Sequence, residues 1–120
     1  MKLVIPGRLP GLNEYTKACN YNRFKGAKMK REVEEIIQWE IKRQLKCKKF
    51  KCIKLVFRWI EPNMRRDKDN IATGKKFILD SMQKAGTLAN DGWSQIAKFE
   101  DEFAVDKENP RVVVEIEEVA

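Results

Sequence analysis

Residues 65 to 70 read Arg-Arg-Asp-Lys-Asp-Asn, so two aspartates stand one residue apart directly behind two arginines. In an extended or turn segment, side chains two residues apart can point to a common side. Paired carboxylates supply the oxygen ligands that Mg²⁺ and Mn²⁺ prefer. A third aspartate follows in the turn sequence Asn90-Asp91-Gly92. Asp67, Asp69 and Asp91 are therefore candidate metal ligands, provided that the fold brings them together.

Each aspartate also has an ordinary structural interpretation. Asp69 can be the N-cap of a following helix, and Asp67 a solvated turn residue. Asp-Gly is a common turn dipeptide, so Asp91 alone indicates no more than a turn. The sequence leaves both interpretations open at this point.

A lysine would lie on the same side as these aspartates if a helix begins near Asp69. At about 100° per residue, Thr73, Lys76 and Asp80 then lie within about 40° of Asp69 on one helix face. An ammonium group there can contact a phosphate and stabilise the charge that develops on it in a transition state. The alternative role of Lys76 is an i,i+4 salt bridge to Asp80.

The elements that must position these residues are predicted from hydrophobic periodicity. Residues 2–5 predict a short strand, 11–26 a functional loop that carries aromatic side chains and can contain a helical turn, and 27–47 a helix. Residues 52–60 alternate as a half-buried strand, and 70–83 predict a second helix. Residues 94–105 and 111–119 predict two strands joined as a C-terminal hairpin. The predicted apolar stripe of the first helix comprises Met29, Val33, Ile36, Ile37, Ile41 and Leu45.

This element order, β-α-β-α-β-β, indicates an α+β fold in which two helices pack on a mixed sheet. The length of 120 residues fits one domain, residues 1–120. No apolar run approaches the ~20 residues that span a bilayer, and the N-terminus lacks the pattern of a signal peptide. We therefore expect a cytoplasmic protein without a membrane association.

Charge and composition limit the ligands and the catalytic mechanisms that this chain can use. The formal net charge is +7, and residues 1–99 hold 23 of the 25 bases but only ten of the 18 acids. Such a surface attracts polyanions, of which nucleic-acid backbones are the commonest in cells. The chain has no histidine, which excludes histidine-dependent nucleophilic catalysis. Its three cysteines lack the spacing of a zinc site or a disulfide framework.

Nucleotide triphosphate binding is not expected either. The segment Thr73-Gly74-Lys75-Lys76 has a Gly-Lys pair, but a P-loop needs a glycine five positions earlier, where this chain has Asp69. We therefore expect no nucleotide cofactor.

The three segments RRDKDN, KKFILDSMQKAG and NDGWSQI together resemble the signature of the RusA family of Holliday junction resolvases, which are frequent in phages and prophages. The resemblance is most specific between residues 65 and 96. It extends to the Pro-Gly-Leu-Asn-Glu-Tyr segment near the N-terminus and to the closing strand.

The resemblance implies a homodimeric, Mg²⁺-dependent endodeoxyribonuclease, with Mn²⁺ as a possible substitute, that resolves four-way junctions in branched DNA by paired symmetric nicks. It places the catalytic aspartates on Asp67, Asp69 and Asp91. The catalytic lysine falls on Lys76 when counted back from Asp80, with Lys75 as the second choice, whereas counting forward from Asp69 reaches Thr73. The residues expected to bind nucleic acid are Arg65, Arg66, Lys68, Lys75, Asn13 and Tyr15.

Two other functions remain compatible with the residues. A noncatalytic basic module that binds DNA or RNA would show salt-sensitive binding that is indifferent to Mg²⁺. A structural or regulatory protein would use its Asp-Lys-Asp segment only to cap a helix.

Overall fold

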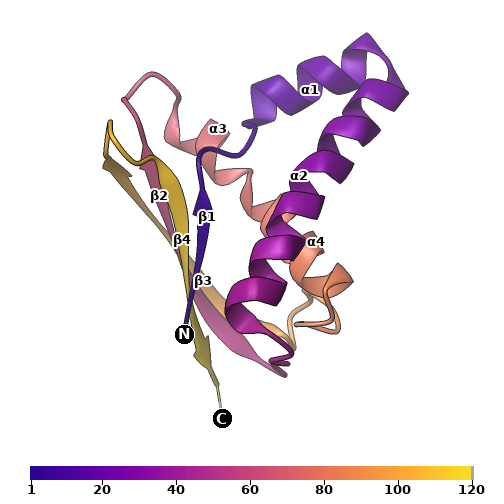
Figure 1. Ribbon diagram of the computed structural model, residues 1–120, viewed down its shortest axis with the longest axis vertical. Coiled ribbons are helices and arrows are strands. Elements are labelled where there is room, and N and C mark those ends of the chain that lie inside the picture. Colours follow the sequence, from indigo (N-terminus) through magenta and orange to yellow (C-terminus); the bar gives the residue numbers. More distant parts are fainter. Residues whose placement is uncertain (120) are drawn as a thin grey trace.

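A four-stranded mixed sheet carries helices on one of its faces (Figure 1). The structure is a computed structural model that describes residues 1–119. The elements in chain order are β1 (Lys2–Pro6), α1 (Leu12–Tyr21), α2 (Arg23–Leu45), β2 (Ile53–Glu61), α3 (Lys68–Ala72), α4 (Lys75–Lys84), β3 (Ile96–Val105) and β4 (Arg111–Glu118). The predicted α+β class is confirmed.

The strand order is β1-β4-β2-β3. β4 pairs antiparallel with both β1 and β2, whereas β2 and β3 run parallel, with Phe57 opposite Asp101. Parallel neighbours need a crossover connection, and α3 and α4 provide it. The core lies between the sheet and the helices. Its fully buried large side chains include Leu3, Ile5, Ile37, Ile41, Leu55, Phe57, Trp59, Ile78 and Met82.

The predicted C-terminal hairpin is wrong, because β2 lies between β3 and β4. The burial of the two strands explains this arrangement. Val112 and Val114 in β4 are buried, and such a strand gains from a central position. In contrast, β3 carries the charged run Lys98 to Glu102 and is largely exposed, which suits an edge strand.

The predicted loop over residues 11–26 is also wrong, because it forms α1 and the first turn of α2. α1 buries only Ala18 among its ten residues, and its apolar side, Leu12, Tyr15 and Ala18, is too short to stand out from the surrounding polar residues. Local capping defines its ends instead. The Gly11 N–H donates to Glu14, and the Asn22 side chain accepts from the Lys25 N–H at 2.7 Å to begin α2.

The predicted helix over residues 70–83 is divided into α3 and α4 at Thr73 and Gly74. The Gly74 N–H donates to the carbonyl oxygen of Ile71, which tightens the chain there. A Cβ atom at Gly74 would lie 3.2 Å from both Leu9 and Trp59. The absence of a side chain therefore allows this turn to pack directly on the core.

One face of α2 differs from the predicted stripe. Ile36 is 59% exposed, whereas the acidic residues Glu34 and Glu40 are buried. Glu34 pairs with Lys84 of α4, and Glu40 accepts hydrogen bonds from Arg43 and Gln44. Ion pairs thus replace part of the expected apolar contact between α2 and its neighbours.

Two expectations about composition can be compared with the structure. Cys19, Cys47 and Cys52 are free cysteines, as their spacing predicted. Within residues 1–119, no helix is long and apolar enough to cross a membrane.

Candidate active site

The Arg-Arg-Asp-Lys-Asp-Asn motif follows the C-terminal end of β2. Asp67 occupies the N-cap position of α3, but its side chain makes no capping hydrogen bond and is exposed. Asp69 lies in the first turn of the helix, where its carboxylate accepts only a local hydrogen bond from the Asn70 N–H at 2.9 Å. Helix capping therefore does not account for either carboxylate, and both have oxygens free for a ligand.

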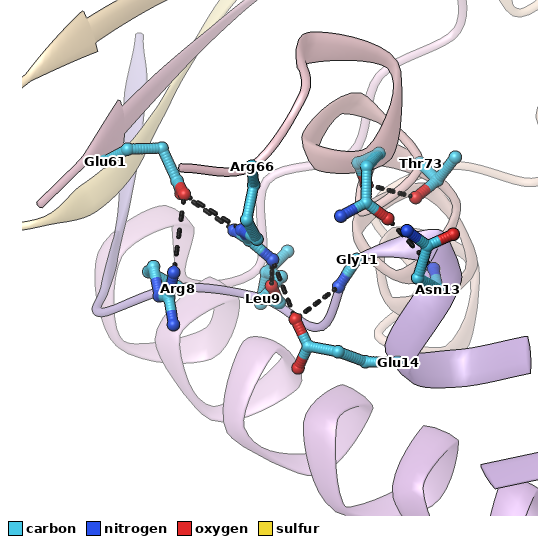
Figure 2. Close-up of polar contacts among 9 residues, drawn as sticks. Arg8, Leu9, Gly11, Asn13, Glu14, Glu61, Arg66 and Thr73 are labelled. Carbon is cyan, nitrogen blue, oxygen red and sulfur yellow. Dashed lines mark hydrogen bonds and ion pairs between the residues drawn. The ribbon is translucent and has the colours of Figure 1, made fainter. Parts of the chain in front are cut away.

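Arg66, the second arginine of this motif, attaches it to neighbouring segments of the chain (Figure 2). Its guanidinium group donates two parallel hydrogen bonds to Glu61, at 2.9 and 2.8 Å, and contacts the Leu9 carbonyl oxygen and Glu14 at 3.0 and 3.2 Å. Burial alone would lower the pKa of Arg66, but its bonds to Glu61 and Glu14 raise it overall. Arg66, predicted to contact a phosphate, thus joins the end of β2 to the segment that leads into α1.

The start of α1 is attached to the same motif through Asn70. The backbone N–H of Asn13 donates to the Asn70 side chain at 2.9 Å, and the Thr73 hydroxyl donates to the Asn70 carbonyl oxygen at 2.7 Å (Figure 2). A Cβ atom at Gly11 would lie only 2.6 Å from Asn70 Oδ1, so a larger residue there would displace the Asn70 amide from this contact.

The Tyr15 side chain extends from α1 and packs against the core. Its ring meets Phe77 edge-on, with centroids 5.5 Å apart, and burial is the main reason that its pKa is raised. The half-buried ring forms one wall of a hollow of about 210 Å³ that Lys30, Thr73 and Lys76 also border. Its predicted contact with nucleic acid stays a prediction.

Lys76 of α4 contacts Asp91, which lies in the loop between α4 and β3. Its ammonium nitrogen lies 3.2 Å from Asp91 Oδ2 and 3.2 Å from Asp80 Oδ1, although the side chain remains 67% exposed. The hydrogen bond to Asp80, followed by that to Asp91, raises the pKa of Lys76. Lys76 is therefore a cation at neutral pH, accessible to solvent and oriented by two carboxylates.

Lys75, its neighbour, has a different environment. Its ammonium nitrogen lies 2.8 Å from Asp101 Oδ2 and 3.9 Å above the centre of the Phe99 ring. Asp101 in turn accepts a hydrogen bond from the Trp59 indole N–H at 2.8 Å. Lys75 is only 15% exposed, so its contacts hold α4 against β3.

Asp101, the partner of Lys75, is a residue that sequence reasoning missed. It lies on β3 between Phe99 and Phe103, on the side of the strand that faces the helices. The signal was present, because strict alternation places this acid on the same side as the two aromatic residues.

The structure does not bring Asp67 and Asp91 together. Asp67 borders a hollow of about 400 Å³ beside Phe103 and Val105, at the end of β3. Asp91 borders a separate hollow of about 320 Å³ beside Ile96 and Phe99, at the beginning of that strand. Within residues 1–119, no group of three or more acidic, cysteine or histidine side chains is placed to hold a metal ion.

Topology explains this separation. β3 runs parallel to β2, so it must begin at the end of the sheet where β2 also begins. The motif after β2 and the loop before β3 consequently lie at opposite ends of the strand pair. Arg65 and Lys68 are exposed at the Asp67 end, and Lys68 lies over the Phe103 ring at 5.4 Å.

The candidate site thus comprises exposed carboxylates after the end of β2 and, separately, an exposed lysine that two carboxylates orient. The family model described as Endodeoxyribonuclease RusA matches residues 12–117. The chain therefore belongs to the RusA family, whose members are nucleases that act on Holliday junctions. A search of curated proteins found no match.

The buried contact between Arg66 and Glu61 generates a stability prediction. Arg66→Gln leaves the buried Glu61 carboxylate with only its longer contact to Arg8, at 3.6 Å, and removing one partner of a buried pair costs about 3 kcal/mol. We expect this loss in the free energy of unfolding measured by urea titration. The matched control is Arg65→Gln at the exposed neighbour, which should change stability by less than about 0.5 kcal/mol.

A double variant checks the cause. Glu61→Gln combined with Arg66→Gln removes both charges, so it should be more stable than the sum of the single effects predicts. Additive losses would show that the pair itself does not stabilise the fold.

Proposed function

We propose that this protein is a Mg²⁺-dependent endodeoxyribonuclease that resolves Holliday junctions by paired symmetric nicks, with Mn²⁺ as an alternative cation. The family supports nuclease action on branched DNA. The observation that carries the residue assignment is the contact between Lys76 and Asp91. Two residues assigned to catalysis from separate motifs meet at 3.2 Å, although 15 positions separate them in the chain.

The proposed catalytic carboxylates are Asp67, Asp69 and Asp91, which have the oxygen donors that suit a divalent cation. Their chemistry fits such an ion, but their arrangement in a single chain does not, because Asp67 and Asp91 border separate hollows. We therefore assign no catalytic step to the cation. A cation of this kind supplies an activated water and charge stabilisation in phosphodiester hydrolysis.

We assign to Lys76 the stabilisation of negative charge on the phosphate undergoing cleavage. Its exposure supports this role, and its two carboxylate partners orient the ammonium group before DNA binds. Lys75 is less suitable, because Asp101 and the Phe99 ring already surround its charge. We propose that Lys75 positions α4 on the sheet.

The remaining basic residues divide by accessibility. Arg65 and Lys68 are exposed and are proposed to contact phosphates that flank the cut. The donors of Arg66 are occupied by protein acceptors, so we propose that it positions the motif. Asn13 and Tyr15 lie on α1 near the same surface and are retained as candidate DNA contacts.

Replacing one carboxylate should separate cleavage from binding. Asp67→Asn keeps the size of the side chain but removes its charge, so we expect no cleavage of a labelled four-way junction in Mg²⁺ while affinity persists. Gel-shift and cleavage assays on the same DNA provide the measurement. Retained cleavage would contradict the assignment. Binding by the unaltered protein that ignores Mg²⁺, with no cleavage of any branched DNA, would favour a noncatalytic binding module.

The two adjacent lysines provide a second, internally controlled test. Lys76→Met should lower the rate constant for cleavage about 10²-fold, by loss of charge stabilisation, and leave the melting temperature nearly unchanged. Lys75→Met should do the reverse, because it leaves Asp101 without its cation while most cleavage remains. Single-turnover cleavage and thermal unfolding measure the two effects. An exchange of the two outcomes would transfer the catalytic role to Lys75.

We further propose that the active form is a homodimer. A four-way junction has two-fold pseudosymmetry, so a two-fold protein pair presents two sites to two strands at once. Sedimentation equilibrium should give twice the mass of one chain, and both nicks should appear within one binding event on a circular substrate that carries an extruded junction. A monomer that releases singly nicked DNA would contradict the proposal.

A further inference from the structure

Trp93 is fully exposed, although its indole is among the largest apolar side chains. It lies in the loop between α4 and β3, two residues after Asp91. An exposed indole contributes little to the stability of its own chain, because it removes no apolar area from water on folding. Its position next to a proposed catalytic residue therefore needs another explanation.

The loop that carries Trp93 is held by hydrogen bonds on both sides of the indole. The N–H groups of Gln95 and Ile96 donate to the Gly92 carbonyl oxygen at 3.1 and 3.0 Å. The Ile53 N–H of β2 donates to the Gln95 carbonyl oxygen at 2.8 Å, and Lys76 holds Asp91 at 3.2 Å. The backbone thus presents the indole at a defined place relative to Asp91.

The surroundings of Trp93 suit a flat apolar group. The indole borders the hollow of about 320 Å³ that Asp91, Lys98 and Phe99 also line. Two residues of chain span at most about 7 Å, and successive nucleotides of one DNA strand rise about 3.4 Å. A phosphate bound near Asp91 therefore places an adjacent base within reach of Trp93.

We propose that Trp93 stacks on an unpaired or unstacked nucleobase at the branch point of the DNA substrate. The inference rests on the proposed function, because it takes the cleaved phosphate to lie near Asp91. A branch point exposes base faces that a continuous duplex keeps stacked, and an aromatic side chain binds any base through its π-face. Trp93 therefore contributes selectivity for branched over linear DNA.

A second copy of the chain is the other candidate to cover the indole. Position favours DNA, because the indole borders the same hollow as Asp91, and a second copy seated there would cover a proposed catalytic residue. The test distinguishes these occupants through oligomeric state.

The chain contains its own control at Trp39. This side chain is 62% exposed on α2, next to the acidic residues Glu32 and Glu35, and the Arg43 guanidinium lies 5.3 Å from its ring. The third tryptophan, Trp59, is only 2% exposed. In a Trp39→Phe background, Trp93 is consequently the solvent-exposed tryptophan within residues 1–119.

The experiment is a fluorescence and gel-shift titration with a synthetic four-way junction and a linear duplex of equal length, without divalent cation so that no cutting occurs. In the Trp39→Phe protein, junction DNA should quench the exposed indole more strongly than duplex does. Trp93→Ala should weaken junction binding about tenfold and leave duplex binding nearly unchanged, and Trp93→Phe should retain most of the affinity. Trp39→Ala should change neither affinity.

Equal losses on junction and duplex, or unaltered junction affinity in Trp93→Ala, would overturn the proposal. Conversion of a dimer to a monomer by Trp93→Ala in sedimentation would also overturn it and assign the indole to a protein interface. The nuclease function can fail independently of the stacking proposal. A protein that shows the junction-dependent quenching and affinity but cuts no DNA in Mg²⁺ or Mn²⁺ would support stacking and contradict the proposed nuclease.

Discussion

The paired hydrogen bonds between Arg66 and Glu61 are the contact on which the arrangement of the site depends. A carboxylate at the end of a central strand is buried, so it requires a cation with matching geometry, and the planar guanidinium group provides it. The same arginine reaches the segment before α1. One buried charge pair thereby fixes the start of the RRDKDN motif, the crossover and the N-terminal segment relative to one another.

Much of this protein could be predicted from local pattern. Alternation identified β2, and the helical spacing identified the greater part of α2 and the crossover helices. The contact between Lys76 and Asp80 follows from their separation of four residues alone. The assignment of the RRDKDN motif to a strand end is also local, because it requires only that β2 stops at Glu61.

What could not be predicted depends on contacts between distant segments. The pairing of β4 with β2 rather than β3 is decided by which strand gains most from burial, and no local turn signal reveals that choice. α1 has a short apolar side of which only Ala18 is buried, and Glu14 and Asn22 define its ends. The separation of Asp67 from Asp91 follows from the parallel pairing of β2 and β3, which the hairpin prediction had obscured.

The edge position of β3 has a consequence for solubility. Ten residues of backbone face outward without a neighbouring strand on that side, and such an edge can recruit the same segment of other molecules into cross-β aggregates. Glu100 and Glu102 alternate along this strand on the side away from the helices, where Lys98 and Arg58 bind them. These gatekeeper charges disfavour fibril-like stacking at the edge of the sheet.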